Sequence, residues 1–509
     1  MPAEFGNGTR RRALLAATLL VAACAPSGPA HVSLRYKLHP DPAAGRLDVE
    51  AEYRGPSGRE VTFFNTMDYA GAASSRFVRG LAVTNGAGHE LAVVRDGARW
   101  RVFVPPNGLV RYRYSIDLAG LAADGGGAVT SVLDSVHALL YAGQIFVTPA
   151  PEAFGAAPAE VGEPEVTARA RASVAVEAPR SWQVASSWGA PLARIEFAAD
   201  SLDALVDGVL ALGDYAFEQW KAGDMKLFVA WRGHSRAEQD SLASLVLALA
   251  KRYTGVLDRP AGPRGFLVLD APPRDVRAVA GGAGPAAGSA AAPSATVLSN
   301  AATLVVTVPE PLSLAPNGGL DFLVAHELFH WWCGANGVLA YREDALLGMS
   351  EGFADYAAAR ALRGLGRWDE ARFRGFLADR RAIWQSASER DEPLDSLSWR
   401  YGESAAMGDL VRAKGALVAS VLDHELGQGS PDPRRGLPDL YRALARRCSF
   451  RPGRCLFGLA DFEAALRTVG GEPGRAVDSY EDLAGRGLGP RLGAAIAPER
   501  RAPEPHAGP

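Results

Sequence analysis

Polar and apolar residues alternate over the first part of the chain, from residue 32 to about residue 119. The alternation is clear at residues 47–53, LDVEAEY, and at residues 111–116, RYRYSI, and Gly or Pro interrupts it at intervals. A period of two residues is typical of strands with one buried face. The pattern therefore predicts an N-terminal antiparallel β domain, which we assign with its Gly-, Ala- and Pro-rich surface loops to residues 25–215.

Helical spacing prevails in the second half of the chain. Ser235, followed three residues later by Glu238, is the pattern of a capping box and predicts a helix over residues 237–251. The apolar periodicity predicts further helices over residues 320–333, 350–365, 369–386, 407–426, 437–447 and 459–469. The fold class is therefore α+β, with a mixed domain at 216–366, a C-terminal helical domain at 367–490 and a disordered tail at 491–509.

One apolar, β-branched segment, residues 303–308, comes just before the helix predicted at 320–333. Such a strand is either the edge of a sheet, along which a peptide can lie, or an internal core strand. The pattern leaves both interpretations open.

Length and charge exclude one class of function. With 509 residues, of which 48% are hydrophobic, the chain supports more than one domain and sizeable cores. The net charge of −3 offers no basic surface for nucleic acid. Neither quantity indicates an oligomeric state.

The segment HELFH, residues 326–330, contains His326, Glu327 and His330. Two histidines four residues apart lie on one face of a helix, which suits a single metal ion, and the glutamate can act as a base toward water on that ion. The surrounding residues 320–333 are almost wholly apolar, with Asn317 as the candidate cap. Burying two imidazoles and a carboxylate without a partner is costly, so the segment predicts one Zn²⁺ per chain.

A catalytic zinc usually has three protein ligands, and Glu351 in the segment MSEGFADY, residues 349–356, is the candidate for the third. Asp355 follows one helical turn later on the same face. It can accept the ring N–H of a zinc-binding histidine, or it can be an ordinary surface carboxylate. Cys333 is interpreted as a buried free thiol, because a fourth protein ligand would close the site to water.

These two segments resemble the gluzincin metallopeptidases, and more closely the glycyl aminopeptidase family (metallopeptidase family sixty-one) than the aminopeptidase N branch. The resemblance rests on HELFH followed by Trp331 and Trp332, and on SEGFADY, and it covers about residues 32–485. It implies a thermolysin-like gluzincin catalytic domain at residues 216–366, with Glu327 as catalytic base and a peptide or protein as substrate.

The chain departs from the family at the oxyanion-binding position. Residues 413–418, AKGALV, resemble the family's Tyr-x-Lys-Gly helix, whose tyrosine stabilises the tetrahedral oxyanion, but Arg412 occupies the tyrosine position. Arg412, or Tyr401 eleven residues upstream, can supply a hydrogen-bond donor instead. Either residue can equally be structural, and the sequence leaves these alternatives open.

A second departure concerns the substrate's amino terminus. Relatives carry a Gly-rich strand with a glutamate that binds the free amine, whereas the corresponding residues 281–288 contain no acid. A buried ammonium group without a counter-charge binds poorly, so strict aminopeptidase specificity is not expected. A linker without a substrate role is the other interpretation of this stretch.

The first 24 residues predict a lipoprotein signal peptide. Three arginines at 10–12 precede an apolar run at 13–23, and the residues VAAC at 21–24 look like a bacterial lipobox. A lipid on Cys24 would tether the protein to a membrane of the cell envelope, facing the periplasm or the cell surface. A plain secretory signal is the alternative.

Cys448 and Cys455 flank a turn-forming interval and predict either a small disulfide loop or two reduced thiols.

Together these features predict an exported, lipid-anchored zinc metallopeptidase that acts on peptides. Two other classes stay open: a catalytically impaired, zinc-retaining peptide-binding or scaffold lipoprotein, and a surface-assembly protein with a structural zinc. The presence of Glu327 argues against the first, because binding alone does not need a base. The second would usually recruit a fourth zinc ligand.

Overall fold

The computed structural model describes most of the chain between residues 32 and 492. The predicted leader with Cys24, the Gly-rich residues 281–288, Asn317 and Cys448 lie outside the described residues. Within the part that is described, no helix is both long and apolar enough to cross a membrane. The described residues are 32–65, 68–69, 72–124, 130–150, 170–189, 196–271, 296–300, 302–308, 311–314, 319–334, 337–341, 344–427, 436–447, 455–469, 485, 488, 491 and 492.

The alternating N-terminal segment forms a six-stranded sheet in the order β15-β13-β1-β2-β9-β6. Every second residue of β2, from Leu47 to Tyr53, is buried, so the period of two places one face of the strand in the core. The predicted β domain is confirmed, but β1 and β13 pair in parallel, which alternation cannot reveal. The strands are β1 (Val32–Asp41), β2 (Arg46–Arg54), β6 (Val78–Asn85), β9 (Leu109–Asp117), β13 (Ala170–Val176) and β15 (Glu196–Ala199).

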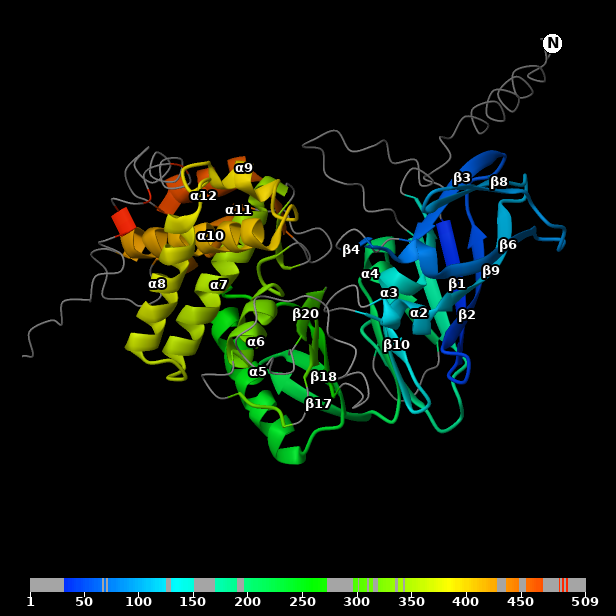
Figure 1. Ribbon diagram of the computed structural model, residues 1–509, viewed down its shortest axis with the longest axis horizontal. Helices are drawn as coiled ribbons and strands as arrows, with labels where there is room; N and C mark the ends of the chain where they lie inside the picture. The colour runs from blue at the N-terminus through cyan, green and yellow to red at the C-terminus, as the bar shows by residue number, and fades with distance from the viewer. Residues whose placement is uncertain are drawn as a thin grey trace, which may run out of the picture.

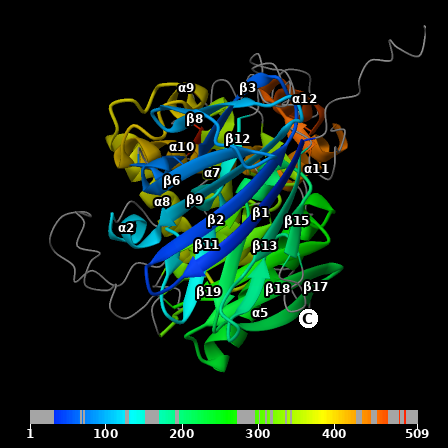
Figure 2. The same ribbon diagram turned by 90° about the vertical axis from the view of Figure 1, so that its right-hand side faces the viewer.

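Two four-stranded sheets complete the N-terminal part, which faces the viewer in Figure 2. One contains β12 (Val147–Pro149), β3 (Arg59–Asn65), β8 (Arg99–Val104) and β7 (Val93–Asp96); the other contains β10 (Val132–Leu133), β11 (His137–Tyr141), β16 (Val209–Gly213) and β14 (Gln183–Ser186). The short elements between them are β4 (Asp68–Tyr69), β5 (Ala72–Ala73), the 3-10 helix η2 (Ser74–Phe77), α2 (Leu118–Ala123), α3 (Ala142–Ile145) and α4 (Leu202–Val206).

A five-stranded mixed sheet follows, in the order β17-β18-β19-β21-β20. The three central strands are parallel, and β17 and β20 are antiparallel to their neighbours. Helix α5 (Arg236–Leu257) connects β18 to β19, and the predicted capping box of Ser235 and Glu238 at its start is confirmed. The strands are β17 (Ala216–Ala222), β18 (Met225–Arg232), β19 (Arg264–Asp270), β20 (Thr296–Asn300) and β21 (Thr303–Thr307).

The interpretation of residues 303–308 as a sheet edge is wrong. Strand β21 pairs with β19 on one side and with β20 on the other, so it is an internal strand. Strand β20, which precedes it in the chain, is the edge of the sheet. Apolar, β-branched composition is typical of a buried strand, but it does not identify the strand's neighbours.

Helices lie on the face of the five-stranded sheet that points away from the N-terminal sheets, and they occupy the opposite end of the molecule (Figure 1). The four helices predicted from residue 369 onward are all present, within two residues at each end. One hydrophobic core extends from Met225 in β18 to Leu492 and joins the sheet to these helices. The elements are α6 (Leu320–Phe329), β22 (Leu339–Tyr341), η6 (Asp344–Leu346), α7 (Leu347–Gly364), α8 (Glu370–Ser386), α9 (Leu394–Ser398), α10 (Ala405–Gly427), α11 (Leu437–Arg447), β23 (Cys455–Phe457) and α12 (Leu459–Val469).

The sheet of β10, β11, β16 and β14 packs against the five-stranded sheet through a second, smaller apolar cluster. Close polar contacts lie at the same junction: Nδ1 of the buried His137 is 2.8 Å from the partly exposed Asp134, and its Nε2 is 3.8 Å from the buried Asp270. Asp270 in turn pairs with Arg232 at 2.8 Å. The apolar cluster consists of Leu139, Tyr141, Ala185, Val209, Ala211 and Tyr215 on one side, and Ala230, Phe266, Val268 and Val305 on the other.

Candidate metal centre

Helix α6 carries His326 and Glu327 and is fixed firmly in the core. Its N-cap is Gly319, in the left-handed conformation and without a side-chain cap, rather than the expected Asn317. The helix also ends earlier than predicted, at Phe329, and the chain continues to Cys333 in tighter turns. His330 nevertheless keeps right-handed helical angles, so it stays on the same face as His326.

Two tryptophans hold the end of α6 against the rest of the domain. The indole N–H of Trp331 donates to the carbonyl of Thr303 in β21, and that of Trp332 donates to the carbonyl of Arg259. Both side chains are buried. Because each buried indole has a hydrogen-bond acceptor, the residues that follow His330 are fixed in position.

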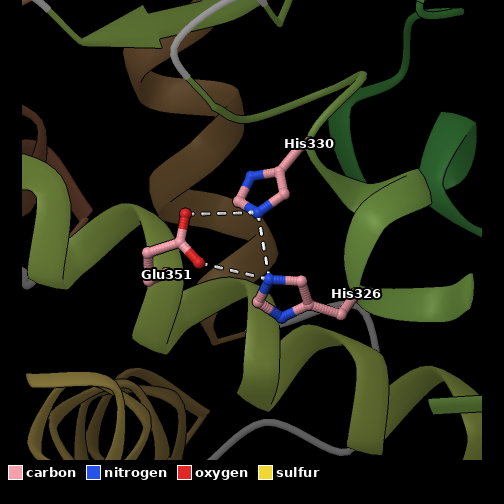
Figure 3. A group of neighbouring side chains, drawn as sticks. All are labelled: His326, His330 and Glu351. Carbon is pink, nitrogen blue, oxygen red and sulfur yellow. Dashed lines mark hydrogen bonds and ion pairs between the residues drawn. The ribbon is translucent and has the colours of Figure 1, made fainter. Parts of the chain in front are cut away.

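The side chains of His326, His330 and Glu351 converge on one point between α6 and α7 (Figure 3). The two Nε2 atoms are 3.1 Å apart, and the Glu351 carboxylate oxygens are 3.3 Å from Nε2 of His326 and 3.5 Å from Nε2 of His330. Among the described residues, this is the one group of three or more ligand-type side chains close enough to hold a metal ion.

The geometry fits zinc. Zinc–ligand distances of about 2.0–2.1 Å in a tetrahedral site place two ligand atoms about 3.3 Å apart. The three observed separations, from 3.1 to 3.5 Å, scatter around this value. Two imidazoles and one carboxylate form the ligand set of a catalytic zinc that keeps a position for water.

Hydrogen-bond acceptors on the far side of each ring orient the two histidines. Nδ1 of His326 lies 2.8 Å from Oδ1 of Asp355, and Nδ1 of His330 lies 3.2 Å from the carbonyl oxygen of Cys333. A proton on each Nδ1 leaves both Nε2 lone pairs directed at the same point. Two lone pairs in contact repel each other, so this arrangement favours a cation between them.

The electrostatics of the metal-free site also favour a cation. Burial lowers the pKa of His326, but its interactions with Asp355 and Glu351 outweigh this and raise the pKa to about 10. Burial raises the pKa of Glu351, but His330 and His326 lower it to about 2. His326 is therefore protonated at neutral pH in the metal-free site, and a bound metal ion would replace a proton there.

Glu327 lies beside the three convergent side chains without belonging to the ligand set. Its Oε1 is 4.0 Å from Nε2 of His326, and its side chain keeps about a fifth of its surface exposed, at 22%. A carboxylate at this separation is close enough to take a proton from a water molecule held at the site.

Arg412 is directed at Asp355. Its Nη2 is 2.7 Å from Oδ1 of Asp355, and Nη2 of Arg380 in α8 is 3.1 Å from Oδ2 of the same carboxylate. Burial lowers the pKa of Arg412, while Asp355 raises it by a larger amount, so the guanidinium stays charged. This contact gives Arg412 a structural partner in the core.

Tyr401 lies in the turn between α9 and α10, and its ring packs over α10 at Gly408. Burial raises the pKa of its hydroxyl to about 12, and the negative charges of Glu351, Asp355 and Glu327 contribute to this increase. The Tyr401 phenol is therefore protonated at neutral pH. The turn is held by Ser398, whose hydroxyl accepts the backbone N–H of Gly348 in α7.

The cysteines are in two states. Cys333 is buried and free, as predicted, and burial raises the pKa of its thiol to about 12. Cys455 is in a disulfide. Its predicted partner, Cys448, lies outside the described residues.

Comparisons with known proteins give a family match for the N-terminal part of the chain and solved structures with a similar fold. Residues 36–214 match the family described as Peptidase M61 N-terminal domain. The fold is similar to that of an aminopeptidase N family protein from Idiomarina loihiensis, with a TM-score of 0.67 at 16% identity over 89% of this chain and 76% of that one. It is also similar to a variant M1 zinc metallopeptidase from Deinococcus radiodurans bound to a Tyr-Ser-Ala substrate, with a TM-score of 0.53 at 13% identity over 90% and 94%.

At these identities the structural likeness is one of fold. No curated protein sequence matches the chain significantly. The match to the Peptidase M61 N-terminal domain agrees with the family resemblance that the HELFH and SEGFADY segments predicted, although it covers residues 36–214 and does not include those segments.

Proposed function

We propose that this chain is an exported zinc metallopeptidase that hydrolyses peptide bonds at the site of His326, His330 and Glu351. The observation that carries the proposal is the convergence of three ligand atoms at tetrahedral spacing, with Glu327 next to them and outside the ligand set. The relationship to zinc peptidases and the mixed sheet under α6 support it.

Zinc bound by these three residues would act as a Lewis acid and lower the pKa of a water molecule in its open position. Glu327 would accept a proton from that water as it attacks the scissile carbonyl, and would then donate the proton to the departing amine. Asp355 and the carbonyl of Cys333 hold the two imidazoles in the tautomer that leaves Nε2 free.

Tyr401 is the better candidate for the oxyanion donor. The Arg412 guanidinium is held by its 2.7 Å contact with the buried Asp355 carboxylate, and turning it fully toward a substrate would leave that charge without this partner. The Tyr401 hydroxyl keeps its proton at neutral pH and can donate it in a hydrogen bond to a developing oxyanion.

The zinc site and the hydrolysis can be tested separately. Glu327→Gln should retain one zinc per chain and lose peptide hydrolysis, whereas His330→Ala should lose both. Zinc analysis and a peptide-library digest of the form beginning at residue 24 measure the two properties. Equal zinc content in wild type and His330→Ala would reject the site. Zinc and peptide binding without turnover in the wild type would instead identify a scaffold lipoprotein, and zinc without either property would indicate a structural ion.

We also propose that a lipid on Cys24 anchors the protein in the cell envelope. The support is the run VAAC at residues 21–24 after three arginines. Mass spectrometry of the membrane fraction should find an acylated amino-terminal cysteine, and Cys24→Ser should release the protein or block its processing. An unmodified mature terminus at another residue would exclude the anchor.

A further inference from the structure

We propose that Arg380 and Arg412 are positioning residues that clamp Asp355 against His326 and so determine zinc affinity. The inference rests on the proposed zinc site and adds two residues to it. Arg412 occupies the position that a tyrosine has in the resembled family, so the clamp is a property of this chain.

Asp355 is completely buried and lies within ion-pair distance of side chains from three helices. Its Oδ1 faces Nδ1 of His326 at 2.8 Å and Nη2 of Arg412 at 2.7 Å, and its Oδ2 faces Nη2 of Arg380 at 3.1 Å. If the neutral imidazole of His326 were its one partner, the Asp355 carboxylate would keep a full negative charge in the core, at a cost of several kcal/mol. The two guanidinium groups offset that charge, and each fixes one carboxylate oxygen.

The packing of α7 against α10 sets this geometry. The two helices approach each other closely at Gly352 and Gly415, where a Cβ atom on Gly352 would be 2.4 Å from the Cα atom of Gly415. Asp355 and Arg412 each lie three residues from these glycines and therefore on the same helical faces. A guanidinium reaches the carboxylate from this distance, and Arg380 approaches from α8 on the other side.

The consequence for the metal is the orientation of one imidazole. Asp355 held on both oxygens cannot turn away from Nδ1 of His326, so Nε2 stays directed at Glu351 and His330. Groups that orient a metal ligand in this way typically change metal affinity or activity by about ten- to a hundredfold when removed. Each arginine acts through Asp355 and touches neither the metal nor the substrate.

The test is the zinc dissociation constant of the full chain, measured by competition with a chelator. Arg380→Ala and Arg412→Ala should each weaken zinc binding by about ten- to a hundredfold. Arg381→Ala, an exposed arginine beside Arg380 on the same helix, should leave it unchanged. Arg412→Lys should recover part of the affinity, and Arg412→Tyr, which introduces the family's residue, should resemble Arg412→Ala.

A second series tests whether the arginines act through the carboxylate. In an Asp355→Asn background, Arg380→Ala and Arg412→Ala should have little further effect on zinc affinity. Unchanged affinity in both arginine variants, or the same losses with Asp355→Asn present, would overturn the clamp. Failure of the wild type itself to bind zinc would reject the proposed function, so the two failures are distinct. The thermal unfolding of each zinc-free variant identifies any that do not fold, and Arg412→Lys then carries the comparison.

Discussion

Gly352 of α7 and Gly415 of α10 are in direct backbone contact. A Cβ atom on Gly352 would lie 2.4 Å from the Cα atom of Gly415, and one on Gly415 would lie 2.2 Å from the carbonyl oxygen of Gly348. Backbone atoms cannot move aside as the end of a side chain can. Since α7 carries Glu351 and Asp355 and α10 carries Arg412, the distance between these helices also sets the metal centre.

Gly415→Ala should therefore destabilise the protein by about 1–3 kcal/mol and weaken zinc binding, because the added methyl group separates α7 from α10. Gly375→Ala is the matched control, since Gly375 is also helical and a Cβ atom there would meet nothing within 4 Å. That variant should be as stable as wild type or slightly more stable. Chemical denaturation measures both. Equal stability of the two variants would contradict the close contact.

Zinc should raise the unfolding temperature of wild type. A ligand that binds only the folded state at 100 times its Kd adds about 2.7 kcal/mol of stability. The increase should persist in Glu327→Gln and disappear in His330→Ala, because only the second substitution removes a ligand. Calorimetry of the zinc-free and zinc-loaded forms gives the comparison, and a full zinc-induced shift in His330→Ala would rule out this ligand set.

Tyr401→Phe should lower kcat by about a hundredfold to a thousandfold, the usual effect of removing one oxyanion donor. Its zinc content should not change, because the hydroxyl is not part of the ligand set. Arg412→Ala should instead lower the zinc affinity. Turnover by Tyr401→Phe at the wild-type rate, in fully zinc-loaded protein, would assign the oxyanion to another donor.

Peptide turnover should not require a free amino terminus. Residues 281–288 contain no acid to pair with a substrate ammonium, so an acetylated peptide loses no ionic contact there. Matched free and acetylated peptides should have kcat/KM values within a few fold of each other. The loss of an ionic contact worth 1.4 kcal/mol would instead lower kcat/KM of the acetylated peptide by about tenfold. A strong preference for the free amine would mean that another carboxylate binds it.

The junction between the sheets should contribute stability that is lost in acid. Burial raises the pKa of Asp134, but its hydrogen bonds with His137 and with nearby amides outweigh this and lower the pKa to about 2 from 3.8. The unfolded chain therefore binds more protons between these two values. The contribution is complete above about pH 4 and disappears as the pH falls toward 2.

Asp134→Asn should remove this contribution. The stability difference between wild type and Asp134→Asn should be constant above about pH 4 and shrink toward pH 2, as measured by denaturation of the zinc-free proteins. Asp96→Asn, in an exposed hairpin, is the control. A difference that is the same at pH 2 and pH 6 would show that the carboxylate charge does not matter.

Local spacing predicted most of the metal centre, because helix geometry follows from the sequence alone. His326 and His330 are four residues apart, as are Glu351 and Asp355, so the sequence indicated which side chains share a face. Arg380 was missed because its partner, Asp355, is on another helix and no local pattern connects them. The same limit applies to Arg412, whose departure from the family was visible while its contact with Asp355 was not.

Strand order and helix ends were harder to predict, because they too depend on contacts between residues that are distant in the sequence. Nothing in the apolar residues 303–308 distinguishes a strand with one neighbour from a strand with two, so the sequence left open the choice that the pairing of β21 with β19 and β20 decides. The cap of α6 is Gly319, two residues after the Asn317 that the sequence indicated, and it supplies no side-chain hydrogen bond to the first turn. These features depend on tertiary contacts, whereas periodicity reports only the burial of each face.

The junction around His137 also determines where this protein cannot be divided. A fragment that begins at residue 216 would expose Phe266 and Val268 to water and leave Asp270 without His137 opposite it. The complementary N-terminal fragment would expose Leu139 and Tyr141 from the other side of the same cluster. Contiguous apolar surfaces of this kind promote aggregation. The part of the chain from residue 216 onward is therefore not expected to fold well alone. Shortened forms for expression should keep the sheets on both sides of the junction in one chain.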